Sequence, residues 1–193
     1  IFCSSLSVFG DIKEDYVTEN TKLVSPSIYG MSKFLSEKMF LTWAEKNGGC
    51  VINLRMPAVL GPFMNHNTFI VRLVDAFIEN EQIHVSNKNN LFNNVLDIDD
   101  LCNFIYHLSL TDQHSQSLVL GSNSPVALDK IIHAVGQKFP EVEIHNIVVD
   151  EQKETFYVNP EKAKKLGFKP LDTLDTVKKY LQFKLLDKDC SHT

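Results

Sequence analysis

Hydrophobic residues along the chain alternate between short continuous runs and longer stripes with helical spacing. The short runs are bounded by small or polar residues and predict strands at 1–5, 50–56, 82–86, 117–122 and 141–149. The stripes predict helices at 26–47, 67–80, 99–108, 128–139, 159–167 and 174–186. Strands that alternate with helices at these lengths indicate an α/β fold with a largely parallel sheet.

The first predicted helix carries the clearest boundary signals. Ser25 can cap its N-terminus, Pro26 suits the first position, and Gly48 with Gly49 ends it. One broad face is predicted to be apolar: Phe34, Leu35, Met39, Trp43 and Ala44. Residues 8–27, which precede this helix, are mostly polar and are expected to form a loop.

Small and polar residues follow the first two strands. Ser4, Ser5, Ser7 and Gly10 come after the first strand, and residues 57–62 come after the second. Ligands of parallel α/β sheets bind at the carboxyl ends of the strands, so these positions are the expected place for a site.

Composition narrows the classes of function. Hydrophobic residues make up 44% of the 193 residues, enough for a sizeable core. The net charge of −5 and the pI of about 5.8 argue against nucleic acid as a partner. Apolar runs are too short for a membrane span, so no membrane partner is expected.

Cysteine and histidine spacing gives no metal-binding pattern. Cys3, Cys50, Cys102 and Cys190 are scattered, and the seven histidines show neither HxxxH nor HExxH spacing. We therefore assign no metal. Three of the cysteines sit in apolar runs, which predicts buried free thiols and a reducing, cytoplasmic location.

Tyr29 and Lys33 stand four positions apart near the start of the first helix. This spacing places both side chains on one helix face. The same spacing recurs at Tyr180 and Lys184, so spacing alone does not identify a catalytic pair.

The surrounding segments make the first pair recognisable. CSSLSVFG at 3–10, YGMSK at 29–33, LRMPAVLGP at 54–62 and NNVLDIDDL at 93–101 occur in the order seen in extended short-chain dehydrogenases. The segment YVNPEKAKKLGFKP at 157–170 is similar to the C-terminal "LGW-P" segment of the same group of enzymes. Over essentially its whole length, the chain resembles the NAD-dependent epimerase/dehydratase family, which acts on nucleotide sugars.

The resemblance implies a partial Rossmann-type doubly wound parallel sheet, with its first strands missing, and a smaller α/β substrate-binding lobe. It also implies NAD or NADP as cofactor, a nucleotide-sugar substrate and a homodimer through the Tyr29 helix. Phe40 and Leu41, expected to be exposed on that helix, would fit such a contact.

Catalytic roles carried over from the family fall on Ser5, Tyr29 and Lys33. A phenol with a pKa near 10 is a poor base at neutral pH, but a nearby ammonium and a cationic nicotinamide favour its phenolate. Tyr29 would then be the acid/base, and Lys33 would assist it and hold the nicotinamide ribose. Ser5 would bridge the substrate oxygen and the tyrosine.

Binding roles fall on the residues around this set. The expected cofactor contacts are Ser4, Tyr29, Lys33, Pro57 and Val59. The expected substrate contacts are Ser7, Ala58, His66, Asn67 and Asn93.

Each role has a purely structural alternative. Ser5 could satisfy backbone groups at a strand end, Tyr29 could be a half-buried helix aromatic, and Lys33 could be a solvated surface residue. His66 and Asn67 could be polar loop residues. Asp99 and Asp100 are interpreted as helix N-terminal acids rather than catalytic groups.

Two positions depart from the family pattern in ways that bear on substrate. The family often has Asn where Ala58 stands and a phosphate-binding Arg where Asn93 stands. Either another residue such as Arg72 or Lys88 binds the substrate, or the substrate is not a standard nucleoside diphosphate sugar. Leu6 and Ser7 replace the carboxylates that a dehydratase would need after the catalytic Ser, which favours an epimerase or reductase.

The glycine-rich GxxGxxG turn that binds the dinucleotide pyrophosphate does not occur in the sequence. We therefore expect the chain to be the C-terminal portion of a longer protein, with NAD(P) bound weakly or not at all by these residues alone. The predicted domains are 1–61 with 91–121 for the cofactor-binding part, and 62–90 with 122–193 for the substrate-binding lobe.

Two other functions compete with this enzyme. A non-catalytic dinucleotide-sensing or scaffold relative would keep the fold without using the Ser5–Tyr29–Lys33 set. A classical short-chain alcohol or steroid dehydrogenase is disfavoured, because the long chain after Pro62 suits a second lobe better than a short specificity loop.

Overall fold

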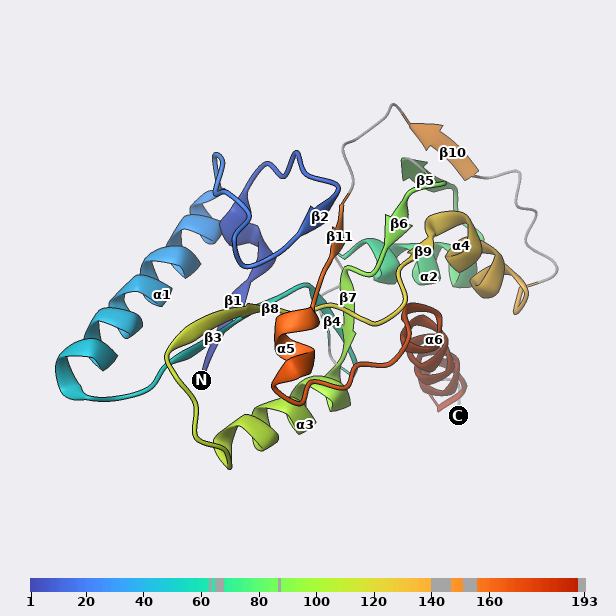
Figure 1. Cartoon of the computed structure of the whole chain (residues 1–193). Coiled ribbons are helices and arrows are strands. Elements are labelled where there is room, and N and C mark those ends of the chain that lie inside the picture. The colour runs from blue at the N-terminus through green and yellow to red at the C-terminus, as the bar shows by residue number, and fades with distance from the viewer. Residues whose placement is uncertain (63, 65–67, 87, 140–146, 151–155, 191–193) are drawn as a thin grey trace.

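The centre of the molecule is a parallel sheet with strand order β1-β3-β8, seen in the computed structural model in Figure 1. The structure describes residues 1–62, 64, 68–86, 88–139, 147–150 and 156–190. The strands are β1 (Phe2–Ser5), β3 (Ile52–Met56) and β8 (Gln116–Val119), with Ser4 paired to Arg55 and Arg55 to Val119. All three carboxyl ends therefore lie at one edge of the sheet.

Helices cover both faces of this sheet. One face packs against α3 (Ile98–Ser109) and α5 (Glu161–Lys165), and the other against α1 (Ile28–Asn47). Ile52 and Leu54 of β3 join Phe104 of α3 in one buried cluster. Arg55 lies on the opposite face, toward α1, because side chains alternate along a strand.

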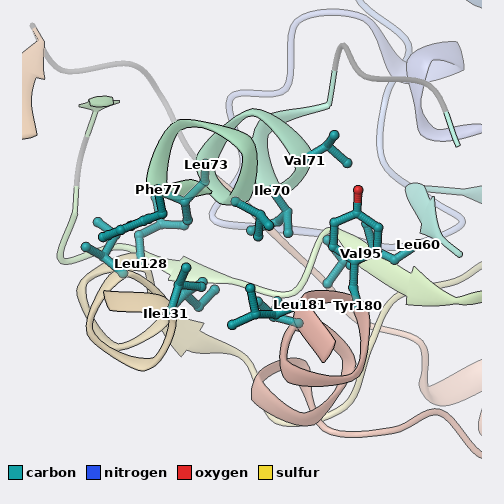
Figure 2. Close-up of a cluster of buried hydrophobic side chains, with 14 of the residues drawn as sticks. Leu60, Ile70, Val71, Leu73, Phe77, Val95, Leu128, Ile131, Tyr180 and Leu181 are labelled. Carbon is teal, nitrogen blue, oxygen red and sulfur yellow. The ribbon is translucent and has the colours of Figure 1, made fainter. Parts of the chain in front are cut away.

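A second buried cluster holds the other end of the molecule together, as Figure 2 shows. Its members come mainly from α2 (Phe69–Glu79), α4 (Leu128–Gly136) and α6 (Thr173–Cys190). The short strands around it are β4 (Ala58–Leu60), β5 (Ile83–Ser86), β6 (Leu91–Phe92), β7 (Val95–Asp97), β9 (Val126–Ala127) and β10 (Ile147–Asp150). β4 pairs with β7, β5 with β10, and β6 with β9. Leu60 and Val95 belong to this cluster although they lie in the predicted cofactor part, and the predicted domain division stays a prediction.

The segment expected to be a polar loop contributes a third cluster. It contains the 3-10 helix η1 (Leu6–Phe9) and β2 (Tyr16–Val17), which pairs with β11 (Tyr157–Val158). Val8, Phe9 and Val17 are fully buried. The predicted loop is therefore largely confirmed, since most of residues 8–27 are irregular. A few buried apolar residues anchor it, and their spacing follows neither a helical nor a strand period.

Most observed helix N-termini differ from the predicted ones by one or two residues, and α1 and α3 also differ in the capping residue. α1 begins at Ile28, and the cap is Ser27, whose side chain accepts from the Gly30 N–H; Ser25 instead has a positive φ of 47°. α3 begins at Ile98, and its cap is Asp97. In both helices two candidate N-terminal residues lie two positions apart in the sequence. The structure uses the later one in α1 and the earlier one in α3.

The apolar face predicted for α1 is mostly not buried. Of its five expected residues only Ala44 is buried, whereas Met39 is 72% exposed and Trp43 is 57% exposed. Most of the apolar face predicted for α1 is therefore left uncovered by the rest of this chain.

The cysteine prediction also needs correction. Cys3, Cys50 and Cys102 are free thiols, but all three are exposed. Cys3 sits on the edge strand β1, and Cys102 follows the buried Leu101 on α3, so each lies beside the core rather than in it. The side chain of Cys190 lies outside the described residues. Among the helices that the structure describes, none is long and apolar enough to cross a membrane.

Candidate active site

The carboxyl end of β1 turns directly into η1, and Ser5 caps that turn. The Ser5 hydroxyl accepts a hydrogen bond from the Ser7 N–H at 3.1 Å and donates to the Ser7 hydroxyl at 3.1 Å. Ser5 therefore satisfies a backbone group at the strand end, which is the purely structural role considered for it above. A catalytic role for the same hydroxyl stays a prediction, and the cap holds that hydroxyl at the strand end.

The start of α1 packs against this turn through a glycine. A Cβ on Gly30 would lie 2.0 Å from the Ser7 carbonyl oxygen, a distance that no side chain tolerates. Gly10, with φ of 71°, makes a similarly close approach to the Val24 carbonyl. These two glycines bring the turn after β1 against the residues that precede and begin α1. Gly30 lies inside the YGMSK segment, but a glycine within a helical pattern does not by itself predict such a contact.

Tyr29 and Lys33 lie together at this end of α1. The Lys33 ammonium is 5.7 Å from the Tyr29 ring centroid and 5.3 Å from the Phe2 ring centroid. It donates a 3.0 Å hydrogen bond to the Cys3 carbonyl on β1. Lys33 thus spans from the helix to the strand that carries Ser5.

The Tyr29 phenol is accessible. Tyr29 is 55% exposed, and none of the described residues hydrogen-bonds to its hydroxyl. The structure therefore brings Lys33 to Tyr29 and places Ser5 on the adjoining turn, but it contains no direct Ser5–Tyr29 bond.

A buried ion pair lies next to this set. Glu37 of α1 receives hydrogen bonds from Arg55 Nε at 3.0 Å and from Arg55 Nη2 at 2.8 Å. The Ser4 hydroxyl donates to Glu37 Oε1 at 2.5 Å. The side chain of Ser4, expected to contact the cofactor, is therefore directed to Glu37, and any cofactor contact at Ser4 would fall to its backbone.

The other predicted contacts divide into two groups. Pro57, Ala58 and Val59 lie just beyond the end of β3, half-buried, with Ala58 paired to Val95 and Val59 to Leu96. His66 and Asn67 lie outside the described residues. Cofactor contact at Pro57 and Val59 and substrate contact at Ala58 stay predictions.

Asn93, predicted to contact substrate, is fully buried in the structure. Its amide nitrogen donates to the Ser122 and Val158 carbonyls at 2.9 and 2.8 Å, and its carbonyl oxygen accepts from the Val158 N–H at 2.7 Å. This side chain joins three segments of the chain. A substrate contact by Asn93 stays a prediction, and it would require these bonds to be exchanged.

Asp99 and Asp100 lie in the first turn of α3, as interpreted from the sequence. Asp99 and the capping Asp97 share Lys179, at 2.7 Å each. Asp100 accepts from the Leu171 N–H at 2.8 Å. Burial raises the pKa of Asp100; Asp97 and Asp99 add to this, and the Leu171 N–H and Lys179 oppose it. These acids tie α3 to the C-terminal segment.

The described residues fit the nicotinamide end of a dinucleotide. The Tyr29 phenol is open, and Lys33 presents an ammonium beside it, on the edge of the sheet where such a group would bind. Within the described part of the chain, no cluster of three or more His, Cys, Asp or Glu residues is placed to hold a metal ion.

Comparison with known families settles the relationship. The sequence model of the NAD dependent epimerase/dehydratase family matches residues 1–121, more than half of the chain. This chain belongs to that family. The resemblance inferred from YGMSK and its companion segments is thereby confirmed.

Two curated relatives of this epimerase/dehydratase chain are distant and longer. The chain is 25% identical over 167 residues to Protein BRI1-5 ENHANCED 1 from Arabidopsis thaliana, covering 84% of this chain and 44% of that protein. It is 29% identical over 85 residues to the Uncharacterized UDP-glucose epimerase YtcB from Bacillus subtilis (strain 168), covering 44% and 27%. The chain thus spans less than half the length of these relatives.

Solved structures share the fold of this family member. UDP-glucuronic acid 4-epimerase from Bacillus cereus in complex with NAD matches with a TM-score of 0.76 and 19% identity, covering 93% of this chain and 60% of that chain. RMD from Pseudomonas aeruginosa complexed with NADPH gives 0.76 and 19%, covering 93% and 64%. These similarities confirm the predicted Rossmann-like α/β fold.

Proposed function

We propose that this chain carries the acid–base centre of an NAD(P)-dependent epimerase or reductase that acts on a nucleotide sugar. The observation that carries the proposal is the accessible Tyr29 phenol with the Lys33 ammonium beside it, at the end of the strand that leads into Ser5. Membership of the epimerase/dehydratase family supports the same chemistry.

In the proposed reaction Tyr29 removes the proton of a sugar hydroxyl while the carbon beneath it loses a hydride. Lys33 stabilises the negative charge that develops on the phenol oxygen, because an adjacent cation favours the ionised form. The Ser5 hydroxyl donates to the substrate oxygen and keeps it within reach of the phenol. When bound, a nicotinamide dinucleotide supplies the acceptor and donor of that hydride.

The substrate class is proposed from the named neighbours. The matched Bacillus cereus enzyme acts on UDP-glucuronic acid, and we propose a nucleotide sugar here as well. Ser7, on the turn after Ser5, is proposed to contact the sugar, together with Ala58, His66 and Asn67. Leu6 and Ser7 leave no carboxylate after Ser5, which supports epimerisation or reduction over dehydration.

The chain contains two arginines, and both stand at sequence positions other than that of the phosphate-binding Arg that Asn93 replaces. Arg55 is buried against Glu37, and Arg72 is an exposed residue on α2 that lines a groove with Asp75 and Glu79. We therefore propose that lysine or backbone groups bind the substrate phosphates.

A second copy of the chain is the proposed partner of α1. Ile28, Leu35, Met39 and Trp43 are exposed on this helix, Ile28 to 93%. A contiguous apolar surface of this kind fits an interface better than solvent. We also propose a cytoplasmic location, since free exposed thiols such as Cys3 suit a reducing compartment.

The test is to replace Tyr29 with Phe in the encoded full-length protein. Turnover of UDP-sugars should fall by about 10²–10⁴-fold, the usual contribution of general acid–base catalysis. Dinucleotide binding, measured by fluorescence titration, should change by less than about threefold, because Phe keeps the ring and the helix.

Two results would contradict the proposal. Unchanged turnover in Tyr29→Phe would remove Tyr29 from the chemistry. Tight dinucleotide binding by the wild-type protein with no turnover of any nucleotide sugar tested would favour the sensing or scaffold alternative.

A further inference from the structure

We infer that Glu37 and Arg55 are positioning residues, which hold Lys33 and Ser5 in register for the proposed reaction. This inference rests on the proposed function of Tyr29, Lys33 and Ser5. Neither Glu37 nor Arg55 needs to touch substrate or cofactor for this role. Their contacts join every element from which the candidate site is built.

The contacts form one connected set across β1, α1, β3 and η1. Arg55 on β3 binds Glu37 on α1 with two nitrogens, at 3.0 and 2.8 Å. Glu37 also accepts from the Ser4 hydroxyl on β1 at 2.5 Å. The Arg55 guanidinium carbon lies 4.9 Å from the centroid of the Phe9 ring on η1. We refer to Ser4, Glu37 and Arg55 as the buried clamp.

Two members of the buried clamp, Ser4 and Glu37, lie close in the sequence to residues of the candidate site. Ser4 directly precedes Ser5 in β1. Glu37 follows Lys33 by four residues and Tyr29 by eight, so all three project from one side of α1. A bidentate guanidinium–carboxylate pair fixes both distance and orientation. The clamp therefore fixes the position of α1 along its axis and its rotation about that axis. These two quantities determine where Tyr29 and Lys33 lie.

Other contacts of α1 are made by partly buried or exposed side chains: Phe34 packs on the cluster around Phe9, and the Phe40 ring lies 5.0 Å from that of Phe2. The helix buries only Gly30, Glu37 and Ala44, at seven-residue intervals. Two of these three have no side chain beyond a methyl group. Glu37 is 1% exposed and is the one buried residue of α1, among those described, whose side chain extends beyond a methyl group.

Stability alone is a weak reason to bury this pair. Removing two charges from water is costly, and well-packed hydrophobic replacements of buried ion pairs are often as stable or more stable. What such replacements lose is the fixed direction of the hydrogen bonds. A role in positioning therefore predicts that catalysis and stability respond differently when the whole pair is replaced.

The experiment compares two double variants of the encoded full-length protein. Glu37→Leu/Arg55→Leu removes the clamp pair without leaving an unpaired charge. Asp75→Leu/Lys184→Leu removes an ion pair of similar length, 2.8 Å, between α2 and α6. Each is measured for Tm, dinucleotide affinity, kcat and KM.

For the clamp variant we expect kcat to fall about 100-fold, as for small misplacements of catalytic groups, with KM and dinucleotide affinity within about threefold of wild type. The α2–α6 variant should keep the wild-type kcat. The single variant Arg55→Lys retains the positive charge but loses the two-nitrogen contact of the guanidinium with Glu37. We expect its kcat to lie between that of the clamp variant and that of the wild type. A clamp variant that folds and keeps full kcat overturns the inference.

Amide hydrogen exchange supplies a readout that does not depend on turnover. Glu37→Gln keeps the shape of the side chain but weakens the pair, so α1 amides should exchange at least about tenfold faster while α3 amides stay unchanged. Equal acceleration in both helices indicates a general loss of stability and overturns the positioning role. If Tyr29→Phe leaves turnover intact, the proposed function fails first and this inference fails with it; if only Tyr29→Phe matters, this inference alone fails.

Discussion

The chain contains two Tyr–x3–Lys pairs on helices, and the structure gives them opposite surroundings. Tyr29 is 55% exposed with the Lys33 ammonium 5.7 Å from its ring centroid. Tyr180 is 4% exposed within the cluster of Figure 2, and Lys184 pairs with Asp75 at 2.8 Å instead. The spacing is the same, but only the first pair is open to a ligand.

Their electrostatics differ as well. Burial raises the pKa of the Tyr180 phenol to about 12, and the Asp75 carboxylate adds to the shift. A phenol in that setting is held neutral and is a worse base than a free one. A Tyr–x3–Lys spacing is therefore informative only where the fold leaves the phenol accessible and holds the cation beside its ring, as the Cys3 carbonyl does for Lys33.

Replacing the two lysines should give the largest difference in turnover between the two Tyr–x3–Lys pairs. In Lys33→Met we expect turnover to fall by about 100-fold or more, because the cation that assists the proposed acid/base is lost. In Lys184→Met we expect wild-type turnover and a loss of about 1–3 kcal/mol in the free energy of unfolding, because this ion pair is only partly exposed. Steady-state kinetics and urea unfolding check both. Equal turnover in the two variants would contradict the assignment of Lys33, rather than Lys184, to the candidate active site.

The residue after each tyrosine sharpens the contrast. Gly30 follows Tyr29 and touches the Ser7 carbonyl, whereas Leu181 follows Tyr180 and is buried in the cluster of Figure 2. Gly30→Ala must push α1 from the turn after β1, so we expect turnover to fall about 10–100-fold. Leu181→Ala should instead cost about 2–5 kcal/mol of stability and leave kcat per folded molecule unchanged.

Kinetics and denaturant unfolding of the same two variants provide the check. A Gly30→Ala protein with normal kcat would show that the close contact with Ser7 is irrelevant to the site. A Leu181→Ala protein with normal stability would show that α6 does not depend on the burial of Leu181 in the cluster of Figure 2.

The last expected effect is a change in stability at alkaline pH. Because the pKa of Tyr180 is raised to about 12 on folding, its neutral form adds stability that is complete below about pH 10 and is lost as pH rises toward 12. We expect the urea midpoint of the wild type to fall more steeply between these pH values than that of Tyr180→Phe. Parallel pH curves for the two proteins would contradict the raised pKa.

The sequence predicted the main strands and helices because their apolar runs are long enough to carry a period. The strands β3, β5 and β8 and the helices α2 and α6 follow from such runs. The two-residue strands β2, β6, β9 and β11 did not, because two residues show no period and their pairing depends on the rest of the fold.

The candidate site was predicted through a motif, but its support was not. Glu37 and Arg55 are charged residues far apart in the sequence, and charge alone predicts a solvated surface. Their burial arises only when α1 lies across β3. Asn93 was likewise predicted as a ligand contact, and the structure shows its side chain joining the connection between β6 and β7 to the segments at Ser122 and Val158.

The most direct measurement compares Tyr29→Phe with Tyr180→Phe, two variants that each remove one hydroxyl from the same type of motif. Turnover and Tm are measured for both in the encoded full-length protein. Our account predicts a loss of turnover of about 10²–10⁴-fold at nearly unchanged Tm for Tyr29→Phe, and nearly wild-type turnover for Tyr180→Phe. Comparable turnover in the two variants would contradict the claim that the open phenol beside Lys33 performs the proton transfer.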